Sequence, residues 1–176
     1  MKAPWWVAVN EQDEMAVSNA GNHMIYLLKS DGTPIESFGG EGKQPGEFNR
    51  PAGIAFHGNN IIVAEQDNHR VQQISKQGQY LSHFGGKEPV DRQLVYPCGL
   101  SIDSDGNILV ADRDNELIKI FSAGGQFLRK IGKKGDFSGP FHCIQHDNYL
   151  IVSDSDDHCV KSVSYTHLTL PTSDLV

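Results

Sequence analysis

Histidine recurs at one place in this sequence: His23, His69 and His158 each follow an Asn or Asp. Imidazole is the commonest metal-binding side chain, so the recurrence raises the hypothesis of a metal site. All ligands of one ion must lie about 2 Å from it, however. Histidines that occur once per repeat are spread over successive structural units. We therefore expect them to make structural hydrogen bonds, and we expect no metal and no cofactor.

A second recurring position is acidic or amide, and its members are Asn19, Glu65, Asp112 and Asp154. A carboxylate there could act as a general acid or base, but catalysis does not need a copy in every unit. An oxygen at this point can accept backbone N–H bonds from the following turn, so we predict a structural role. No Gly-rich phosphate loop or Ser/His/Asp spacing offers another chemistry.

The elements that must position these residues form a tandem repeat. Its units start at Pro4, Pro51, Pro97 and Pro140, which are 47, 46 and 43 residues apart. Each unit holds about four short apolar runs, and none keeps a helical period for ten residues. In the third unit we expect strands at 99–102, 108–112, 117–121 and 127–131, with positive-φ turns at Asp105-Gly106 and Gly124-Gly125. Four-stranded units of this length, repeated in tandem, are typical of propeller blades.

Composition narrows the class of protein. The chain has 176 residues, is 38% apolar and 21% charged, and carries a formal charge of −7. These values exclude a disordered protein, and the longest apolar runs are far shorter than the roughly 18 residues of a membrane span. The acidic balance argues against binding to DNA. Three cysteines without a CxxC pair, and no signal peptide, predict a reducing compartment and hence the cytoplasm.

Each unit contains a segment that resembles the signature of NHL repeats. These segments read Asn22-His23-Met24, Asn68-His69-Arg70, Asn115-Glu116-Leu117 and Asp157-His158-Cys159. The Pro-x-Gly-Ile/Leu start and the Phe-Gly end also match, and the resemblance covers about residues 4 to 161. It implies an all-β fold, an NHL-type β-propeller. Such propellers typically have six blades and often end tripartite-motif ubiquitin ligases, where they recruit RNA or protein. This sequence shows no RING, B-box or coiled-coil pattern, so ligase activity would lie in missing sequence.

The repeat fails near Lys161. Gly32, Gly78 and Gly125 occupy one turn position, and the fourth unit has His167 there. Residues 163–172 resemble a translated transposase sequencing adapter. We therefore expect an incomplete propeller at 1–161, with about three and a half blades at 4–50, 51–96, 97–139 and 140–161. A non-native, disordered tail would follow at 162–176. Such a chain, with uncovered blade faces, should be marginally stable or prone to aggregation.

In a propeller the first strands line a central channel, and several loops share one face. Here these are 40–50, 86–96 and 133–139, with 65–70, 112–116 and 154–158. Loops from different blades converge there, so this face is the expected binding surface. Acidic residues outnumber Lys and Arg on it, which weakens phosphate attraction, but recognition of single-stranded or structured RNA stays open beside protein binding. The candidate partner-binding residues are Arg50, Arg70, Tyr96, Arg113, Lys133 and Lys134.

Peptidylglycine lyase domains offer an enzyme alternative. They resemble these propellers and hold a metal with a His after the first Pro of several blades. The matching positions here are Ala52, Cys98 and Phe141, and His142 is displaced by one. The expected function is therefore a non-catalytic recognition module for protein or RNA, within a larger tripartite-motif-like ligase, with no membrane partner. A metal-dependent lyase is the disfavoured alternative.

Overall fold

A computed structural model describes residues 2–86, 89 and 92–165 of this chain. The described part is all-β, with four antiparallel sheets that form the blades of a propeller. Blades 1 to 3 have four strands each, and blade 4 has three. The predicted fold class, an incomplete propeller with a partial last blade, is confirmed. No described helix is long and apolar enough to cross a membrane.

The strands follow one another in chain order within each blade. Blade 1 contains β1 (Pro4–Val9), β2 (Met15–Asn19), β3 (Met24–Leu28) and β4 (Pro34–Gly39). Blade 2 contains β5 (Pro51–His57), β6 (Asn60–Glu65), β7 (Arg70–Ser75) and β8 (Tyr80–Phe84). Blade 3 contains β9 (Pro97–Ile102), β10 (Ile108–Asp112), the short 3-10 helix η1 (Arg113–Asn115), β11 (Leu117–Phe121) and β12 (Phe127–Ile131). Blade 4 contains β13 (Pro140–His146), β14 (Tyr149–Asp154) and β15 (Cys159–Ser164).

The strands predicted for the third unit are confirmed. Three of the four agree to the residue, and β9 begins two residues earlier than expected, at Pro97. The predicted turns also lie where expected, and in each the second residue has the positive angle: φ is 81° at Gly106 and 83° at Gly125. Short-range turn chemistry therefore sets the strand ends.

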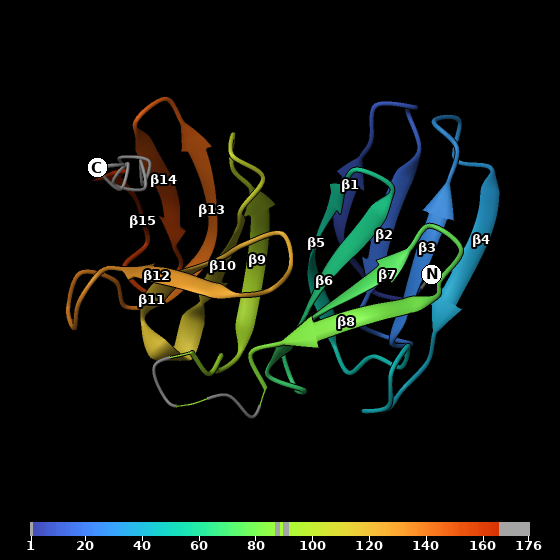
Figure 1. Ribbon diagram of the computed structural model, residues 1–176, viewed down its shortest axis with the longest axis horizontal. Helices are drawn as coiled ribbons and strands as arrows, with labels where there is room; N and C mark the ends of the chain where they lie inside the picture. The colour runs from blue at the N-terminus through green and yellow to red at the C-terminus, as the bar shows by residue number, and fades with distance from the viewer. Residues whose placement is uncertain (1, 87–88, 90–91, 166–176) are drawn as a thin grey trace, which may run out of the picture.

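The first strands of the blades lie toward the middle of the molecule, while β4 and β15 lie at opposite outer sides (Figure 1). β1 contacts β5, β5 contacts β9, and β9 contacts β13. This close stacking explains the Pro-x-Gly start of the repeat. A Cβ on Gly53 would lie 2.5 Å from the Cys98 carbonyl oxygen, and one on Gly99 would lie 2.5 Å from Nδ1 of His142.

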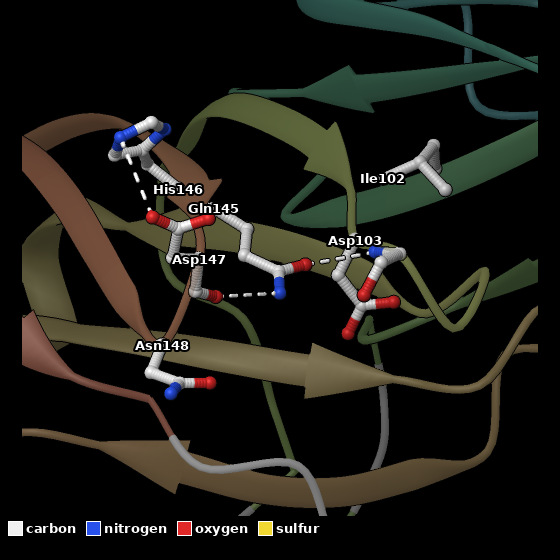
Figure 2. A pocket seen from close by; sticks show the side chains of 7 residues that line it. Ile102, Asp103, Gln145, His146, Asp147 and Asn148 are labelled. Carbon is white, nitrogen blue, oxygen red and sulfur yellow. Dashed lines mark hydrogen bonds and ion pairs between the residues drawn. The ribbon is translucent and has the colours of Figure 1, made fainter.

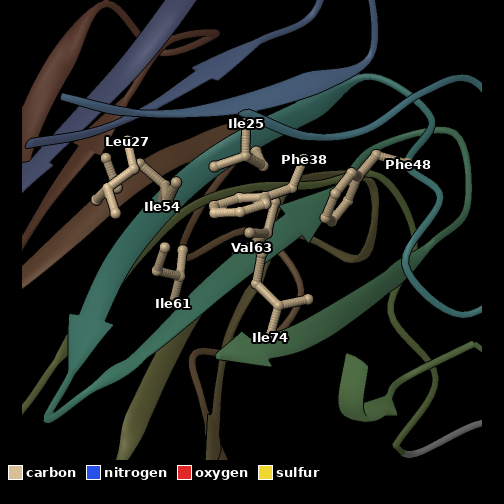
Figure 3. Packing of buried hydrophobic residues seen from close by; sticks show 9 residues of the cluster. Ile25, Leu27, Phe38, Phe48, Ile54, Ile61, Val63 and Ile74 are labelled. Atoms are coloured by element: carbon tan, nitrogen blue, oxygen red, sulfur yellow. The ribbon is translucent and has the colours of Figure 1, made fainter. Parts of the chain in front are cut away.

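Apolar clusters fill the joints between consecutive blades. Figure 3 shows the first, where Ile25, Leu27 and Phe38 of blade 1 pack against Ile54, Ile61, Val63 and Ile74 of blade 2. The turn glycines belong to these joints. A Cβ on Gly78 would strike the ring of Phe38, and one on Gly125 would lie 2.5 Å from Phe84 of the preceding blade. The Phe of each Phe-Gly end thus packs on the turn glycine of the following blade.

The outer sides of blades 1 and 4 have no such cover. Ile54, Leu100 and Cys143 are buried against a preceding blade, whereas Val7 of blade 1, at the same repeat position, is 55% exposed. Ile25, Val71 and Ile118 are buried against a following blade, whereas Val160 of blade 4 is 69% exposed. Each end of the array therefore presents half of a blade joint.

The expected boundary at Lys161 falls inside β15. Residues 162–164 pair with β14, and Tyr165 is buried, with its hydroxyl donating to Oδ2 of Asp103 at 2.6 Å. Residues 162–165 complete a strand and fill the joint between blades 3 and 4, and the non-native origin of 162–176 stays a prediction. Residues 166–176 of the predicted tail lie outside the described residues.

Candidate functional site

The turns and entrance loops predicted to share one face are joined by hydrogen bonds. Asn68 Nδ2 donates to the Gly42 carbonyl at 2.9 Å, and Asn115 Nδ2 donates to the Gln93 carbonyl at 3.0 Å. In blade 4 the Ser155 hydroxyl donates to the Gly139 carbonyl at 3.1 Å. The Asn of the repeat signature therefore ties the turn after the second strand to the loop that enters the blade. We call the surface that carries these entrance loops and turns the loop face; its described residues lie within 40–50, 92–96, 133–139, 65–70, 112–116 and 154–158.

The recurring acidic or amide position holds the same loops. Glu65 accepts the Asn49 N–H at 3.1 Å, and Asp112 accepts the Val95 N–H at 2.6 Å. Asp154 accepts the N–H groups of Ser138 and Gly139 at 3.0 and 2.8 Å. The structural role was predicted, but the main donors lie in the entrance loop rather than in the following turn. Blade 1 has both kinds of donor, since Asn19 accepts the Ala3 N–H at 3.2 Å and, as predicted, the Gly21 N–H of the following turn at 3.1 Å.

In blades 2 to 4 each of these carboxylates is also paired with a cation of the third strand. The distances are 2.5 Å for Glu65–Arg70, 3.0 Å for Asp112–Lys119 and 2.9 Å for Asp154–Lys161. Burial raises the pKa of Glu65, and the opposing effect of Arg70 does not reverse it. Burial likewise raises the pKa of Asp112. At Asp154 burial is outweighed by Lys161 and by the backbone N–H groups, which hold its pKa at about 2.

The signature histidines make a third contact between blades. Nδ1 of His23 accepts the Arg50 N–H, and Nδ1 of His69 accepts the Tyr96 N–H, both at 3.1 Å. Arg50 and Tyr96 precede the first Pro of the next blade and have φ of 49° and 59°. This left-handed region is costly for residues other than Gly, so the hydrogen bond to the histidine helps to hold Arg50 and Tyr96 in it. The sequence predicted hydrogen bonding for these histidines but not this partner.

Arg50 and Tyr96 meet at the loop-face end of the channel, which we call the channel mouth. The Arg50 guanidinium carbon lies 5.5 Å from the ring centroid of Trp5 and 5.9 Å from that of Tyr96. These distances are within the range of cation–π contacts. Three successive blades thus contribute one residue each to this group. Sequence reasoning missed Trp5, although its place directly after Pro4 is a channel position of the repeat.

Aromatic side chains on the first strands of blades 1 and 4 contact each other. The ring of Trp6 lies 5.6 Å from that of Phe141 and 5.0 Å from that of His142. Burial lowers the pKa of His142, which favours the neutral imidazole. Ala52, Cys98 and Phe141 stand where a lyase-type metal site would need histidines. Among residues 2–86, 89 and 92–165, no three His, Cys, Asp or Glu side chains are grouped so that they could hold a metal ion.

The other candidate residues are placed differently. Arg70 is buried, and besides Glu65 it donates to the carbonyls of Lys43 and Glu47 at 2.9 and 3.0 Å. Arg113 binds both carboxylate oxygens of Asp156 at 3.0 Å and so bridges blades 3 and 4. Lys133 and Lys134 are exposed on the loop face. The structure therefore brings together only Arg50 and Tyr96, and it gives Arg70 a structural environment.

Two of the pockets in the described part of the chain lie on opposite faces. One of about 610 Å³ lies on the loop face, and its lining includes Lys43, Asp67, His69, Arg70 and Gln93. The other, of about 810 Å³, lies between the β9–β10 and β13–β14 turns (Figure 2). In Figure 2 the Gln145 amide accepts the Ser104 N–H at 2.8 Å and donates to the Asp147 carbonyl at 2.9 Å. The second pocket is thus built around a bridge between blades, while the first opens among the converging loops.

Comparison with known proteins agrees with this architecture. The model described as "NHL repeat" matches residues 48–74 and 94–121. The chain contains NHL repeats. Protein brain tumor of Drosophila melanogaster is 40% identical over 75 residues, which is 42% of this chain and 6% of that protein. RING finger protein nhl-1 of Caenorhabditis elegans is 35% identical over 74 residues, 42% of this chain and 8% of that protein.

This NHL-repeat chain therefore spans less than a tenth of either curated relative. A solved structure, that of the computationally designed Ika4 protein, superposes with a TM-score of 0.67 at 17% identity. The superposition covers 94% of this chain and 93% of that one. At this identity the likeness shows the fold alone.

Proposed function

We propose that this NHL-repeat chain is part of a non-catalytic recognition module that binds a protein or an RNA through its loop face. The observation that carries the proposal is the convergence of the entrance loops and turns of blades 2, 3 and 4 on one surface. Hydrogen bonds hold these loops, and the surface contains a pocket of about 610 Å³. Binding residues are commonly presented in this way, on loops fixed by a rigid scaffold.

The wider context is part of the same proposal. Partial homology to brain tumor and to a RING finger protein supports a place within a larger tripartite-motif-like ubiquitin ligase. Ligase chemistry would then belong to sequence outside this chain. Cys98 and Cys143 are buried free thiols, and Cys159 is an exposed one, which supports a cytoplasmic location.

The test uses the full-length parent protein in cells, with chemical crosslinking for protein partners and ultraviolet crosslinking for RNA. The loop-face variant is Lys133→Glu with Lys134→Glu, because both side chains are exposed and a charge reversal there leaves the core intact. The matched control is Lys29→Glu, an exposed lysine in the β3–β4 turn on the opposite face. Arg70→Glu is unsuitable, because a buried carboxylate beside Glu65 would disrupt blade 2.

We expect the loop-face variant to lose most of its crosslinks and the control to keep them. Loss of RNA crosslinks alone would favour RNA as the partner, and loss of protein crosslinks alone would favour protein. Equal crosslinking by both variants would contradict the proposal.

A further inference from the structure

Arg50 differs from the other cations that support the loop face. Arg70, Lys119, Arg113 and Lys161 are each paired with a carboxylate. The guanidinium of Arg50 instead lies within cation–π distance of two aromatic rings, those of Trp5 and Tyr96. Within the part of the chain that the structure describes, no carboxylate lies within ion-pair distance of it. The half-buried guanidinium of Arg50 therefore has N–H donors that can bind an anion.

The backbone on both sides of Arg50 is held in place. Its N–H donates to His23 at 3.1 Å, and its carbonyl accepts the Gln66 N–H at 3.2 Å. Its neighbour Tyr96 is fixed in the same left-handed conformation by His69. Blade 3 shows what happens without the histidine. There Glu116 takes the signature position, and Gly139, which has no side chain, takes the place before the proline. His23 and His69 are therefore positioning residues for Arg50 and Tyr96.

Aromatic contacts still allow a guanidinium to bind a ligand. Cation–π contacts with Trp5 and Tyr96 do not use up the N–H donors of Arg50. These donors form a planar fork that matches the two oxygens of a carboxylate. Ordering of the side chain before binding reduces the entropy lost in complex formation.

We propose that Arg50, in contact with the rings of Trp5 and Tyr96, is a carboxylate-binding site at the channel mouth. Its ligand is an acidic side chain or a C-terminal carboxylate of a partner protein. The inference rests on the proposed recognition function of the loop face. A protein carboxylate is favoured over an RNA phosphate because acidic side chains such as Asp67 and Asp114 are exposed on the same face. A single carboxylate meets little of that repulsion, whereas a polyanionic strand meets it along its length.

The experiment is a titration of the ¹⁵N-labelled 176-residue chain, followed by the NMR signals of the arginine Nε–H and tryptophan indole N–H groups. The probes are a capped hexapeptide with a single glutamate, and its neutral match with glutamine in that place, at constant ionic strength. A third arm uses the oligonucleotide hexauridylate. We expect the glutamate peptide alone to shift the Arg50 and Trp5 signals.

Variants assign the site. Arg50→Ala should weaken binding of the glutamate peptide about tenfold, because bonds to a charged group are lost. Arg50→Lys keeps the charge but not the fork, and it should also weaken binding. Arg92→Ala removes an exposed arginine of the same face and should have no effect. His23→Leu should weaken binding and shift the Arg50 signals of the free protein, since the Arg50 N–H loses its acceptor.

Equal shifts with both peptides, or equal binding by Arg50→Ala and Arg92→Ala, would overturn the inference. Tighter binding of hexauridylate at the same signals would overturn the choice of a protein ligand. The loop-face crosslinking experiment does not depend on Arg50. If the titration fails while Lys133→Glu with Lys134→Glu still loses crosslinks, the carboxylate site is wrong and the recognition function stands.

Discussion

Val71 and Val160 occupy the same position of the repeat, one residue into the third strand, but their surroundings are opposite. Val71 is fully buried in the joint between blades 2 and 3, while Val160 is 69% exposed on the outer side of blade 4. The two strands are alike in register, since each valine is paired with the residue before the recurring carboxylate. The difference shows that a blade supplies only half of its own core, and that a neighbour supplies the rest.

The ion pairs of blades 2 and 4 differ in a parallel way. Arg70 is buried between Glu65 and the carbonyls of its entrance loop. Lys161 pairs with Asp154, but its side chain is 25% exposed and it also reaches Asp157. Water can therefore solvate part of the charge of the ion pair in blade 4, but it cannot reach the buried ion pair in blade 2.

The largest contrast is expected from removing the two cations. Arg70→Met leaves Glu65 buried without its partner, and it should cost about 3–5 kcal/mol of unfolding free energy. Lys161→Met should cost only about 1 kcal/mol, because Asp154 keeps its backbone donors. Urea unfolding of both variants measures the difference, and soluble yield is the second readout if Arg70→Met does not fold. Equal losses would mean that blade 4 is as well enclosed as blade 2.

The turn glycines provide the next contrast. Gly125 and Gly32 have nearly the same φ, 83° and 84°, so an alanine at either position suffers the same backbone penalty of roughly 1–2 kcal/mol. A Cβ at Gly125 would also lie 2.5 Å from Phe84, whereas Gly32 has no neighbour within 4 Å. Gly125→Ala should therefore be less stable than Gly32→Ala by roughly a further 1–3 kcal/mol, as measured by urea unfolding. Equal stabilities would show that Phe84 moves aside freely.

Acid titration separates the carboxylates of the two blades. The pKa of Asp154 is about 2 in the folded chain and about 3.9 in a model peptide, so its ionised form stabilises the fold above about pH 4. That contribution, on the order of 2 kcal/mol, is lost as the pH falls from about 4 to about 2. Asp154→Asn should therefore flatten the acid side of the stability curve.

The contribution of Glu65 to stability has the opposite pH dependence. Its pKa is raised, so its contribution is present at low pH and is lost as the pH rises through the folded value. Glu65→Gln should remove a contribution that falls with rising pH. Thermal unfolding from about pH 2 to about pH 6 checks both variants, and a change of the same sign in the two curves would contradict the assignment.

Much of this architecture could be predicted from the sequence, because the signals are local. The strands of blade 3 follow from short apolar runs and turn glycines, and Gly106 and Gly125 have the positive φ that such turns require. The shared loop face follows from strand order alone. Such features depend on a few neighbouring residues, and the repeat supplies several copies of each.

The contents of the channel mouth could not be predicted in this way. His23 reaches Arg50, which lies 27 residues later in the next blade. Arg70 was a reasonable candidate for a surface contact, because a charged residue beside a turn is normally exposed. Its burial depends on Glu65 and on carbonyls of the 40–50 loop, which only the folded chain brings together. Residues that act between blades carry no local sequence signal.

The smallest expected effect on stability concerns Val160 itself. Val160→Ser should change the unfolding free energy by no more than about 0.5 kcal/mol, because the side chain is mostly in water already. Val71→Ser, at the equivalent buried position, should cost several times as much, because it leaves a cavity and a buried hydroxyl. The same Val160→Ser change should reduce self-association in sedimentation velocity, because uncovered apolar faces and an open strand edge favour it. If Val160→Ser instead destabilises the chain as strongly as Val71→Ser, the outer side of blade 4 is covered in solution, and Val160 is as buried as Val71.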